Sequence, residues 1–279
     1  MIDHLQCGGF SLSLKRPLLM GIVNITPDSF SDGGRFFARG DAIAMAMKLV
    51  EEGADIIDLG GESSRPGAAS VSAAEELARL LPVLRAMRDV PVPVSVDTVK
   101  PEVMRVVLDE GAAMINDICA LSAPGTLEVV AASNCAVCLM HMQGEPRTMQ
   151  SSPRYDEVTA DIKTYLAKRV DAAVHAGVAR ERIVIDPGFG FGKTVQHNLD
   201  LLRGLDEICA LDLPVLAGWS RKSSLGKITG RKAEGRLAGS LAAALLALQR
   251  GAHILRVHDV AATRDVVAVF CAYRDGFEE

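Results

Sequence analysis

The chain has 279 residues, of which 49% are hydrophobic and 23% are charged, proportions typical of a globular protein with a sizeable core. The formal net charge of −5 argues against a broad nucleic-acid-binding surface but leaves room for a small anion site. No apolar run reaches membrane-spanning length, and the opening stretch MIDHLQCGGF lacks the basic start and apolar core of a signal peptide. We therefore expect a protein of the reducing cytoplasm.

Two of the six cysteines, Cys135 and Cys138, form a C-x-x-C pair, a spacing that metal and redox sites use. The pair lies in the apolar run CAVCLMHM, and no second pair is in phase with it. We interpret the two thiols as members of a buried strand.

Eight short apolar runs rich in Val, Ile and Leu recur along the chain, as strands buried on both faces do. In chain order they are 18–24, 55–61, 92–97, 113–118, 136–142, 182–188, 213–220 and 253–259. Amphipathic patterns typical of helices fill the gaps, one of them capped by Ser72 and another opened by Pro101. Pro82 is expected to kink the first of these helices without ending it. The alternation predicts an α/β fold, a (β/α)₈ TIM barrel in one domain over residues 1–279, and eight strands disfavour an open doubly wound sheet.

Two further segments extend this prediction. Residues 4–14, with Gly8 and Gly9 in the middle, predict a short N-terminal β-hairpin before the first barrel strand. Segment 237–248 is nearly all Leu and Ala, although a barrel helix needs only one apolar face. Neighbouring helices or a second copy of the chain could cover the other face; we expect a homodimer through this helix.

Polar residues follow every predicted strand, at the end where barrel enzymes carry their chemistry. They are Asn24; Glu62, Ser63, Ser64 and Arg65; Asp97; Asn116 and Asp117; His141; Asp186; Ser220, Arg221, Lys222 and Ser223; and Arg256 and His258. Any one of them could cap a helix or form a turn. Eight strand ends that all deliver polar groups predict one polar site at the mouth of the barrel.

The residue types indicate what this site binds. Asp97, Asn116 and Asp186 can exchange paired hydrogen bonds with the amino-amide edge of a planar heterocycle. The positive charges and donors of Arg65, Lys222, Arg256 and His258 suit an anion, and Lys222 with Ser223 opens a helix whose free N–H groups favour one. Asn24 either offers a neutral oxygen to a Mg²⁺ that keeps its waters or belongs to the turn before Pro27. The sequence contains no His/Cys cluster with zinc spacing and no G-x-S-x-G nucleophile elbow.

The stretch DPGFGFGKT, residues 186–194, looks like a phosphate loop but has the wrong spacing. Only three residues separate Gly188 from Gly192, where a P-loop has four, and Lys193 stands where the dinucleotide fingerprint needs Gly. We expect the glycines to turn the backbone at the barrel rim and Phe191 to lean against the site. Lys193 and Thr194 are expected to face solvent or to cap the next helix.

Eight segments together resemble the dihydropteroate synthase family. They are GIVNITPDSFSDGG, IIDLGGESSRPGA, VSVDT, INDI, LMHMQGEPRTMQ, IDPGFGFGKT, GWSRKSSLG and RVHDV, in the family's order over about residues 18–260. The resemblance implies a TIM-barrel enzyme of folate biosynthesis, usually a homodimer. Such an enzyme condenses 6-hydroxymethyl-7,8-dihydropterin diphosphate with 4-aminobenzoate, assisted by Mg²⁺, and releases 7,8-dihydropteroate and diphosphate; sulfonamides compete for the aminobenzoate place.

The resemblance also implies a role for each matching residue, with Asp97, Lys222, Arg256 and His258 at the centre of the chemistry. Asp97, Asn116, Asp186 and Lys222 would hold the pterin in a pocket lined by Met140, Phe191 and Gly218. Asn24 would bind Mg²⁺ and, with Ser64, Arg256 and His258, the diphosphate. Phe30, Arg65, Pro66, Phe191 and Ser223 would shape the 4-aminobenzoate place.

Three residues depart from the family pattern, and none removes a group that the assignment uses. Ser64 stands where Thr is usual, Cys119 where Ser or Thr is frequent, and Trp219 where a smaller residue precedes Ser-Arg-Lys. Two other classes remain open: a pterin-binding barrel similar to folate-dependent methyltransferases and a pterin-binding paralogue without catalysis. The first has no use for SRK and RVH around a diphosphate, and the intact Asn24, Lys222, Arg256 and His258 speak against the second.

Overall fold

The computed structural model describes residues 3–25, 35–63, 67 and 70–277, without the side chains of residues 35–39. Its strands are β1 (His4–Cys7), β2 (Phe10–Ser13), β3 (Leu18–Asn24), β4 (Ile56–Gly60), β5 (Val94–Asp97), β6 (Met114–Asp117), β7 (Ala136–Met140), β8 (Ile183–Asp186), β9 (Leu216–Ala217) and β10 (Ile254–Val257). Its α-helices are α1 (Arg35–Glu51), α2 (Ala73–Ala86), α3 (Pro101–Asp109), α4 (Thr126–Ala131), α5 (Val158–His175), α6 (Val195–Arg203), α7 (Leu205–Cys209), α8 (Ser223–Thr229), α9 (Leu237–Gln249) and α10 (Val260–Asp275). Short 3₁₀ turns occur at Arg180–Arg182 and Ala233–Gly235.

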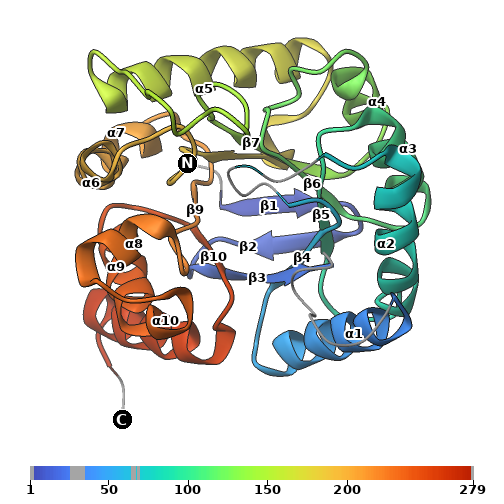
Figure 1. Cartoon of the computed structure of the whole chain (residues 1–279), viewed down its shortest axis with the longest axis horizontal. Coiled ribbons are helices and arrows are strands. Elements are labelled where there is room, and N and C mark those ends of the chain that lie inside the picture. Colours follow the sequence, from blue (N-terminus) through green and yellow to red (C-terminus); the bar gives the residue numbers. More distant parts are fainter. Residues whose placement is uncertain (1–2, 26–34, 64–66, 68–69, 278–279) are drawn as a thin grey trace.

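The last eight strands form one parallel sheet in the order β8-β7-β6-β5-β4-β3-β10-β9, with the helices around it (Figure 1). A bridge between Ile185 and Val215, beside a 2.9 Å hydrogen bond from the Ile185 N–H to the Pro214 carbonyl, joins the two end strands. The sheet is thus a nearly closed barrel, and the predicted TIM-barrel architecture is confirmed.

Each predicted apolar run contains one observed strand, but the run 213–220 is extended only at Leu216–Ala217. Pro214 has no N–H for the ladder, and Arg221 adopts a left-handed conformation with φ of 57°, so the chain turns on both sides of β9. Helix α2 continues through Pro82, as expected, and the Ser72 hydroxyl accepts a hydrogen bond from the Glu75 N–H. Helix α1 begins at Arg35, earlier than the pattern after Asp41 suggested.

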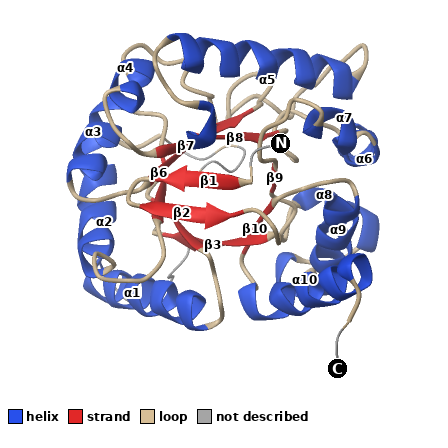
Figure 2. Cartoon of the chain, turned by 180° about the vertical axis from the view of Figure 1, so that it is seen from behind, coloured by secondary structure: helices blue, strands red, loops and turns tan. Residues whose placement is uncertain are grey.

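The predicted N-terminal hairpin is present, and it covers one end of the barrel (Figure 2). Leu5 and Cys7 of β1 are fully buried against the barrel interior, where they join Met20, Met114 and Val184. Because the hairpin covers the amino-terminal ends of the strands, the site lies at the opposite, carboxyl ends.

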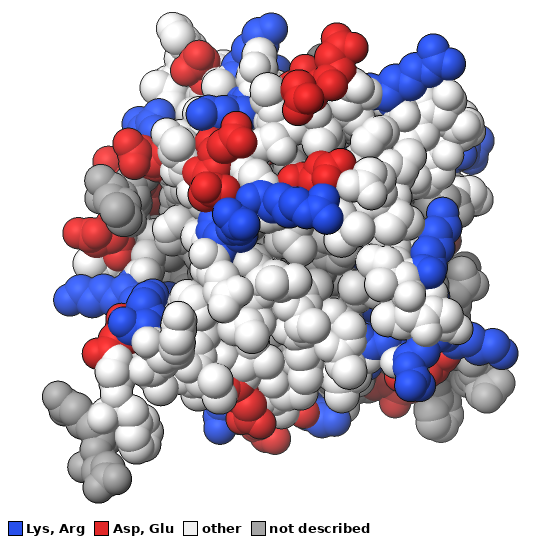
Figure 3. All heavy atoms as spheres, turned by 90° about the vertical axis from the view of Figure 1, so that its left-hand side faces the viewer, with Lys and Arg blue, Asp and Glu red and all other residues white. Residues whose placement is uncertain are grey.

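Helix α9 is apolar on both sides, as its sequence predicted. Ala244 and Ala247 face the barrel, whereas Leu246 on the outer side is 50% exposed. Figure 3 shows a broad area with few charged side chains on the side where α8, α9 and α10 lie in Figure 1. Within the residues that the structure describes, no helix has the length and hydropathy needed to cross a membrane.

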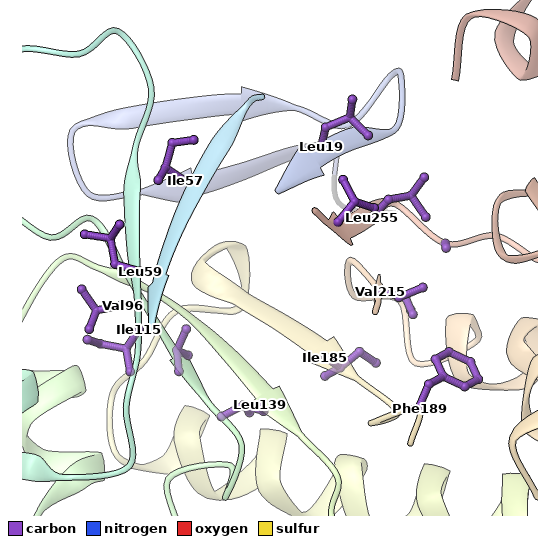
Figure 4. Packing of buried hydrophobic residues seen from close by; sticks show 14 of the residues in the cluster. Leu19, Ile57, Leu59, Val96, Ile115, Leu139, Ile185, Phe189, Val215 and Leu255 are labelled. Carbon is purple, nitrogen blue, oxygen red and sulfur yellow. The ribbon is translucent and has the colours of Figure 1, made fainter. Parts of the chain in front are cut away.

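The main hydrophobic core lies between the strands and the helices. Strand residues that point outward from the barrel, such as Leu19, Ile57 and Ile115, are fully or almost fully buried in it (Figure 4). Cys135 and Cys138 are buried free thiols beside and within β7, which confirms the interpretation of the C-x-x-C pair as part of a strand.

Candidate active site

Alternation along the strands brings the polar side chains into the barrel. Ile56, Met114, Val184 and Ile254 belong to the apolar layer above the hairpin. Two residues further along the same strands stand Asp58, Asn116, Asp186 and Arg256. Side chains two apart on a strand share a face, so these four form a polar layer directly above the apolar one.

Asp58 is the residue of this layer that the sequence analysis missed. It lies inside the apolar run DIIDLGG, not at its end, and its carboxylate is fully buried. Its Oδ2 accepts hydrogen bonds from Arg256 Nε at 2.7 Å and from Asn116 Nδ2 at 3.1 Å. The sequence feature that could have revealed Asp58 is its position two residues after Ile56, which places both side chains on the same, inward face of the strand.

Arg256 also donates from Nη2 to Asp97 Oδ2 at 3.0 Å. One guanidinium therefore joins the carboxylates of β4 and β5 across the barrel, with side chains of Arg256 and Asp97 only 20% and 15% exposed. Burial raises the pKa of Asp97 to about 7, and the charge of Arg256 opposes that rise. Asp97, Asn116 and Arg256, which the sequence predicted separately, form one connected network.

Asp186, Phe191 and Lys222 meet on the other side of the mouth. Lys222 Nζ donates to the Phe189 carbonyl and lies 4.2 Å from the centroid of the Phe191 ring. Burial lowers the pKa of Lys222 to about 8, and Asp186 opposes the shift. Burial raises the pKa of Asp186, which Lys222 in turn counteracts. The predicted pterin residues are thus brought together as two charged groups, one around Arg256 and one around Lys222.

The loop after β8 turns as the glycines predicted. Gly188, Gly190 and Gly192 have φ values of 70°, 83° and 59°, a region that Gly enters without strain. The Gly188 N–H donates to Asp186 Oδ1 at 2.7 Å, which fixes the orientation of that carboxylate. A Cβ at position 188 would lie 1.9 Å from the His141 carbonyl oxygen, so the loop packs directly on the end of β7.

The prediction for the next two residues is half right. Thr194 caps α6, accepting from the His197 N–H at 3.0 Å. Lys193 neither faces solvent nor caps the helix: it is only 3% exposed. The loop folds back over β7 and encloses the lysine side chain, whose Nζ lies 3.0 Å from His141 Nδ1.

Two parallel contacts tie the loop after β9 to the end of β10. The Ser220 hydroxyl accepts from the His258 N–H at 3.2 Å and lies 3.0 Å from His258 Nδ1. Arg221, directly after it, donates from Nε to Asp259 at 3.0 Å. His258 is therefore held at the mouth, next to the loop that carries Lys222.

A partly buried charge cluster lies beside the described ends of the loop after β4. Lys100 Nζ contacts Glu62 and, at 2.5 Å, Glu76 Oε2, while Glu62 Oε1 accepts from the Val71 N–H at 3.1 Å. The sequence predicts Glu62 as one of the strand-end residues of the site; in the structure its carboxylate instead joins residues 62 and 71 at the two ends of this loop.

The remaining predicted residues take three kinds of position. Met140 is buried at the end of β7 beside Asp186, and Gly218 is buried opposite Arg256. Ser223 is the exposed first residue of α8. Phe30, Ser64, Arg65 and Pro66 lie outside the described residues.

Asn24, the predicted Mg²⁺ ligand, is the last residue of β3 and is partly exposed at the mouth. It pairs in register with Gly60, and a Cβ at position 60 would lie 3.4 Å from Asn24 Oδ1. The glycine leaves room beside this oxygen, which suits an ion that keeps waters and meets the protein through few ligands. The described residues contain no group of three or more His, Cys, Asp or Glu that could hold a metal by themselves.

Comparison with known proteins agrees with this geometry. Residues 20–258 match the model of the family described as pterin binding enzyme, so the chain belongs to a class of barrels with a pterin site. It is 50% identical over 262 residues to the dihydropteroate synthase of Haemophilus influenzae, covering 94% of this chain and 95% of the relative. The Escherichia coli enzyme of the same name is also 50% identical, over 94% of this chain and 93% of its own. Within the class, the chain therefore belongs to the dihydropteroate synthase family.

Solved structures lead to the same family. A dihydropteroate synthase of Xanthomonas albilineans with 4-aminobenzoic acid superposes with a TM-score of 0.93 at 51% identity, over 99% of both chains. A structure of that enzyme in complex with 7,8-dihydropteroate gives a TM-score of 0.89 at 48% identity, over 98% of this chain and 99% of the other.

Proposed function

We propose that the protein is a dihydropteroate synthase. It would condense (7,8-dihydropterin-6-yl)methyl diphosphate with 4-aminobenzoate to give 7,8-dihydropteroate and diphosphate. The observation that carries the proposal is a hydrogen-bond network. In it Arg256, whose guanidinium can bind an anion, donates to Asp58 and Asp97, and Asn116 donates to the same Asp58. A heterocycle edge and a diphosphate can therefore be bound a few ångströms apart in one mouth.

The residues fit a substitution in which the leaving group departs first. The methylene C–O bond breaks and its electron pair leaves with the diphosphate, whose charge Arg256 and His258 neutralise. The electron-rich dihydropterin stabilises the cationic methylene, and the carboxylate of Asp97 supports that charge. The neutral amine of 4-aminobenzoate then forms the C–N bond and loses a proton to water. Mg²⁺ held at Asn24 would add positive charge at the leaving group when bound.

The other site residues would bind the pterin, the diphosphate and the 4-aminobenzoate. Asp97, Asn116 and Asp186 would form hydrogen bonds with the N–H groups and the amino-amide edge of the pterin. Lys222 would donate to its ring, and Phe191 would separate the two substrates. Met140 and Gly218 would line the pterin pocket. Ser64 would join the diphosphate site, while Phe30, Arg65, Pro66 and Ser223 would shape the aminobenzoate site.

The proposal is tested by mixing purified protein with the pterin diphosphate, 4-aminobenzoate and Mg²⁺. We expect diphosphate release that requires all three, with dihydropteroate formed in equal amount. EDTA should suppress the release and added Mg²⁺ restore it. Absence of release above blank contradicts the proposal, and release that ignores 4-aminobenzoate would define a hydrolase instead.

The pH dependence of kcat/KM should be bell-shaped. Asp97 serves as a carboxylate, so activity is expected to rise with pH through about 7, the value to which burial raises its pKa. Lys222 serves as an ammonium, so activity should fall through about 8, to which burial lowers its pKa. In Asp97→Asn the rate should be lower throughout and the acid limb lost. Persistence of the same acid limb would assign it to the substrates.

We also propose a homodimer formed through α9 and its neighbours. Large apolar side chains are at least half exposed on α8, α9 and α10: Ile228, Leu246, Val269 and Tyr273. The three helices that carry them lie on the side of Figure 1 that faces the viewer in Figure 3, where a broad area has few charged side chains. Exposed apolar areas of this kind mark interfaces. Sedimentation should show a dimer for the wild type and a monomer for Leu246→Glu. Val174→Glu, on α5 and 39% exposed, should remain a dimer, and a wild-type monomer at micromolar concentration contradicts the assignment.

For the location of this reaction we propose the cytoplasm. All six cysteines are free thiols, a state that a reducing compartment maintains. Cell fractionation with an antibody to the protein tests the proposal, and recovery in an exported fraction contradicts it.

A further inference from the structure

Lys193 is enclosed by the loop after β8, and its side chain contacts protein groups of that loop and of His141. Its Nζ lies 2.9 Å from the Gly188 carbonyl oxygen, 3.0 Å from that of Phe191 and 3.0 Å from His141 Nδ1. A lysine head has three positions for hydrogen bonds, and all three are used. Replacing a buried side chain whose hydrogen bonds are all satisfied is destabilising, because each of its former partners is left buried without a hydrogen bond.

The three contacts hold in either protonation state of the lysine. Burial and the charge of Lys193 lower the pKa of His141 to about 3, so the imidazole is neutral. An ammonium donates to both carbonyls and to Nδ1. A neutral amine donates to both carbonyls and accepts from the other imidazole tautomer. The loop is therefore fastened to β7 whichever form is present.

The other carbonyl groups of the loop also accept hydrogen bonds from side chains. The carbonyl of Gly190 accepts from Gln150 at 2.6 Å, and that of Gly192 accepts from Tyr155 at 2.8 Å. The Phe189 carbonyl accepts from Lys222. Each carbonyl from 188 to 192 thus has a side-chain donor, and Lys193 is the only one of these donors that serves two of them.

We infer that Lys193 is a positioning residue of the pterin site, which acts by fixing the loop that orients Asp186 and Lys222. The inference rests on the proposed function. The Gly188 N–H holds the Asp186 carboxylate, and the Phe189 carbonyl holds Lys222. Both peptides lie next to carbonyls fixed by Lys193, so its loss lets them rotate. Arg256 and His258, on β10 and just after it, are tied to Asp58, Asp97 and Ser220, not to this loop.

The test compares two ligands in the Lys193→Met variant. Calorimetry with 6-hydroxymethylpterin should show a loss of affinity of at least about tenfold, since the two hydrogen bonds to loop carbonyls and the contact to His141 are gone. Inorganic diphosphate with Mg²⁺ should bind within about twofold of wild type, as expected for a site that keeps its partners. Lys168→Met, an exposed lysine on α5, is the matched control and should change neither affinity.

The only tryptophan of the chain reports on the loop directly. Trp219 packs on Phe189, with ring centroids 4.9 Å apart. We expect its emission to change in Lys193→Met and not in Lys168→Met. If Lys193→Met does not fold, Lys193→Gln and Tyr155→Phe, which removes only the donor to Gly192, should show the same split between the ligands, smaller for Tyr155→Phe.

The outcomes separate the two proposals. Retention of pterin affinity within twofold in folded Lys193→Met, or an equal loss for pterin and diphosphate in these variants, overturns the positioning role. Failure of the wild-type protein to bind 6-hydroxymethylpterin overturns the proposed function itself.

Discussion

Asp58→Ala is expected to lower kcat/KM by about 10²–10³-fold, since it removes a buried counter-ion and two hydrogen bonds from charged or oriented groups. Asp58 Oδ2 is the common acceptor for Arg256 Nε and Asn116 Nδ2. Without it the Asn116 amide can turn over and present the wrong atoms to the heterocycle. The guanidinium of Arg256 would keep only its contact to Asp97.

Asp58→Asn separates orientation from charge. An Asn side chain can place its amide oxygen where Oδ2 lies and so keep both donors, while its NH₂ occupies the position of Oδ1, which has no hydrogen-bond partner among the described residues. We expect this variant to keep pterin affinity within about fivefold, which corresponds to the loss of a single modest interaction. Diphosphate affinity should be equal or higher, because Arg256 has lost one counter-ion.

Asp55 provides the control, because it lies on the same segment at the other end of the barrel. It pairs with Arg16 at 2.6 Å and accepts from the Leu19 N–H at 2.8 Å. Asp55→Ala should lower the free energy of unfolding by about 1–2 kcal/mol and leave kcat/KM unchanged. Equal loss of pterin affinity in Asp58→Ala and Asp58→Asn would show that charge, not orientation, is what Asp58 supplies.

Asp58, which the sequence analysis missed, and Lys193, which it misplaced, show what a sequence can and cannot predict. Asn116, Asp186 and Arg256 could be found because each follows directly from a strand pattern whose carboxyl end faces the mouth. Asp58 is inside a strand, where a single carboxylate between apolar neighbours gives no periodic signal of its own. Its role exists only because β10 lies two strands away from β4, on the far side of β3, and brings Arg256 to it.

Lys193 was misplaced for a different reason. The sequence Gly-Lys-Thr in a loop suggests a lysine that faces solvent. The three glycines indicate turns, but they do not indicate that the backbone folds back onto the end of β7. The enclosing partner, His141, lies 52 residues earlier in the chain. Local patterns therefore predicted the order of elements and the rim of the site, whereas contacts between loops of different strands required the fold.

Arg256→Met is expected to lower kcat/KM by about 10²–10³-fold, the usual loss when a preorganised donor to a developing charge is removed. Its effect on binding should depend on pH in a way that distinguishes the two ligands. The charge of Arg256 is the main factor that lowers the pKa of Asp97, which burial raises to about 7. Without it the pKa of Asp97 rises further, and near neutral pH this side chain becomes a protonated carboxyl group that no longer accepts from the pterin N–H groups.

Pterin affinity of the variant, relative to wild type at each pH, should therefore be low at pH 7 and recover as the pH rises and Asp97 ionises. Titration of Lys222 occurs in both proteins and cancels in that ratio. Diphosphate affinity has no such recovery, because the guanidinium itself is missing, and should remain reduced at every pH. Calorimetry from pH 6.5 to about 9, with exposed Arg264→Met on α10 as control, measures both curves. If the two curves of relative affinity against pH were parallel, Arg256 would affect pterin and diphosphate binding equally. The division of this site into a pterin half and a diphosphate half would then be wrong.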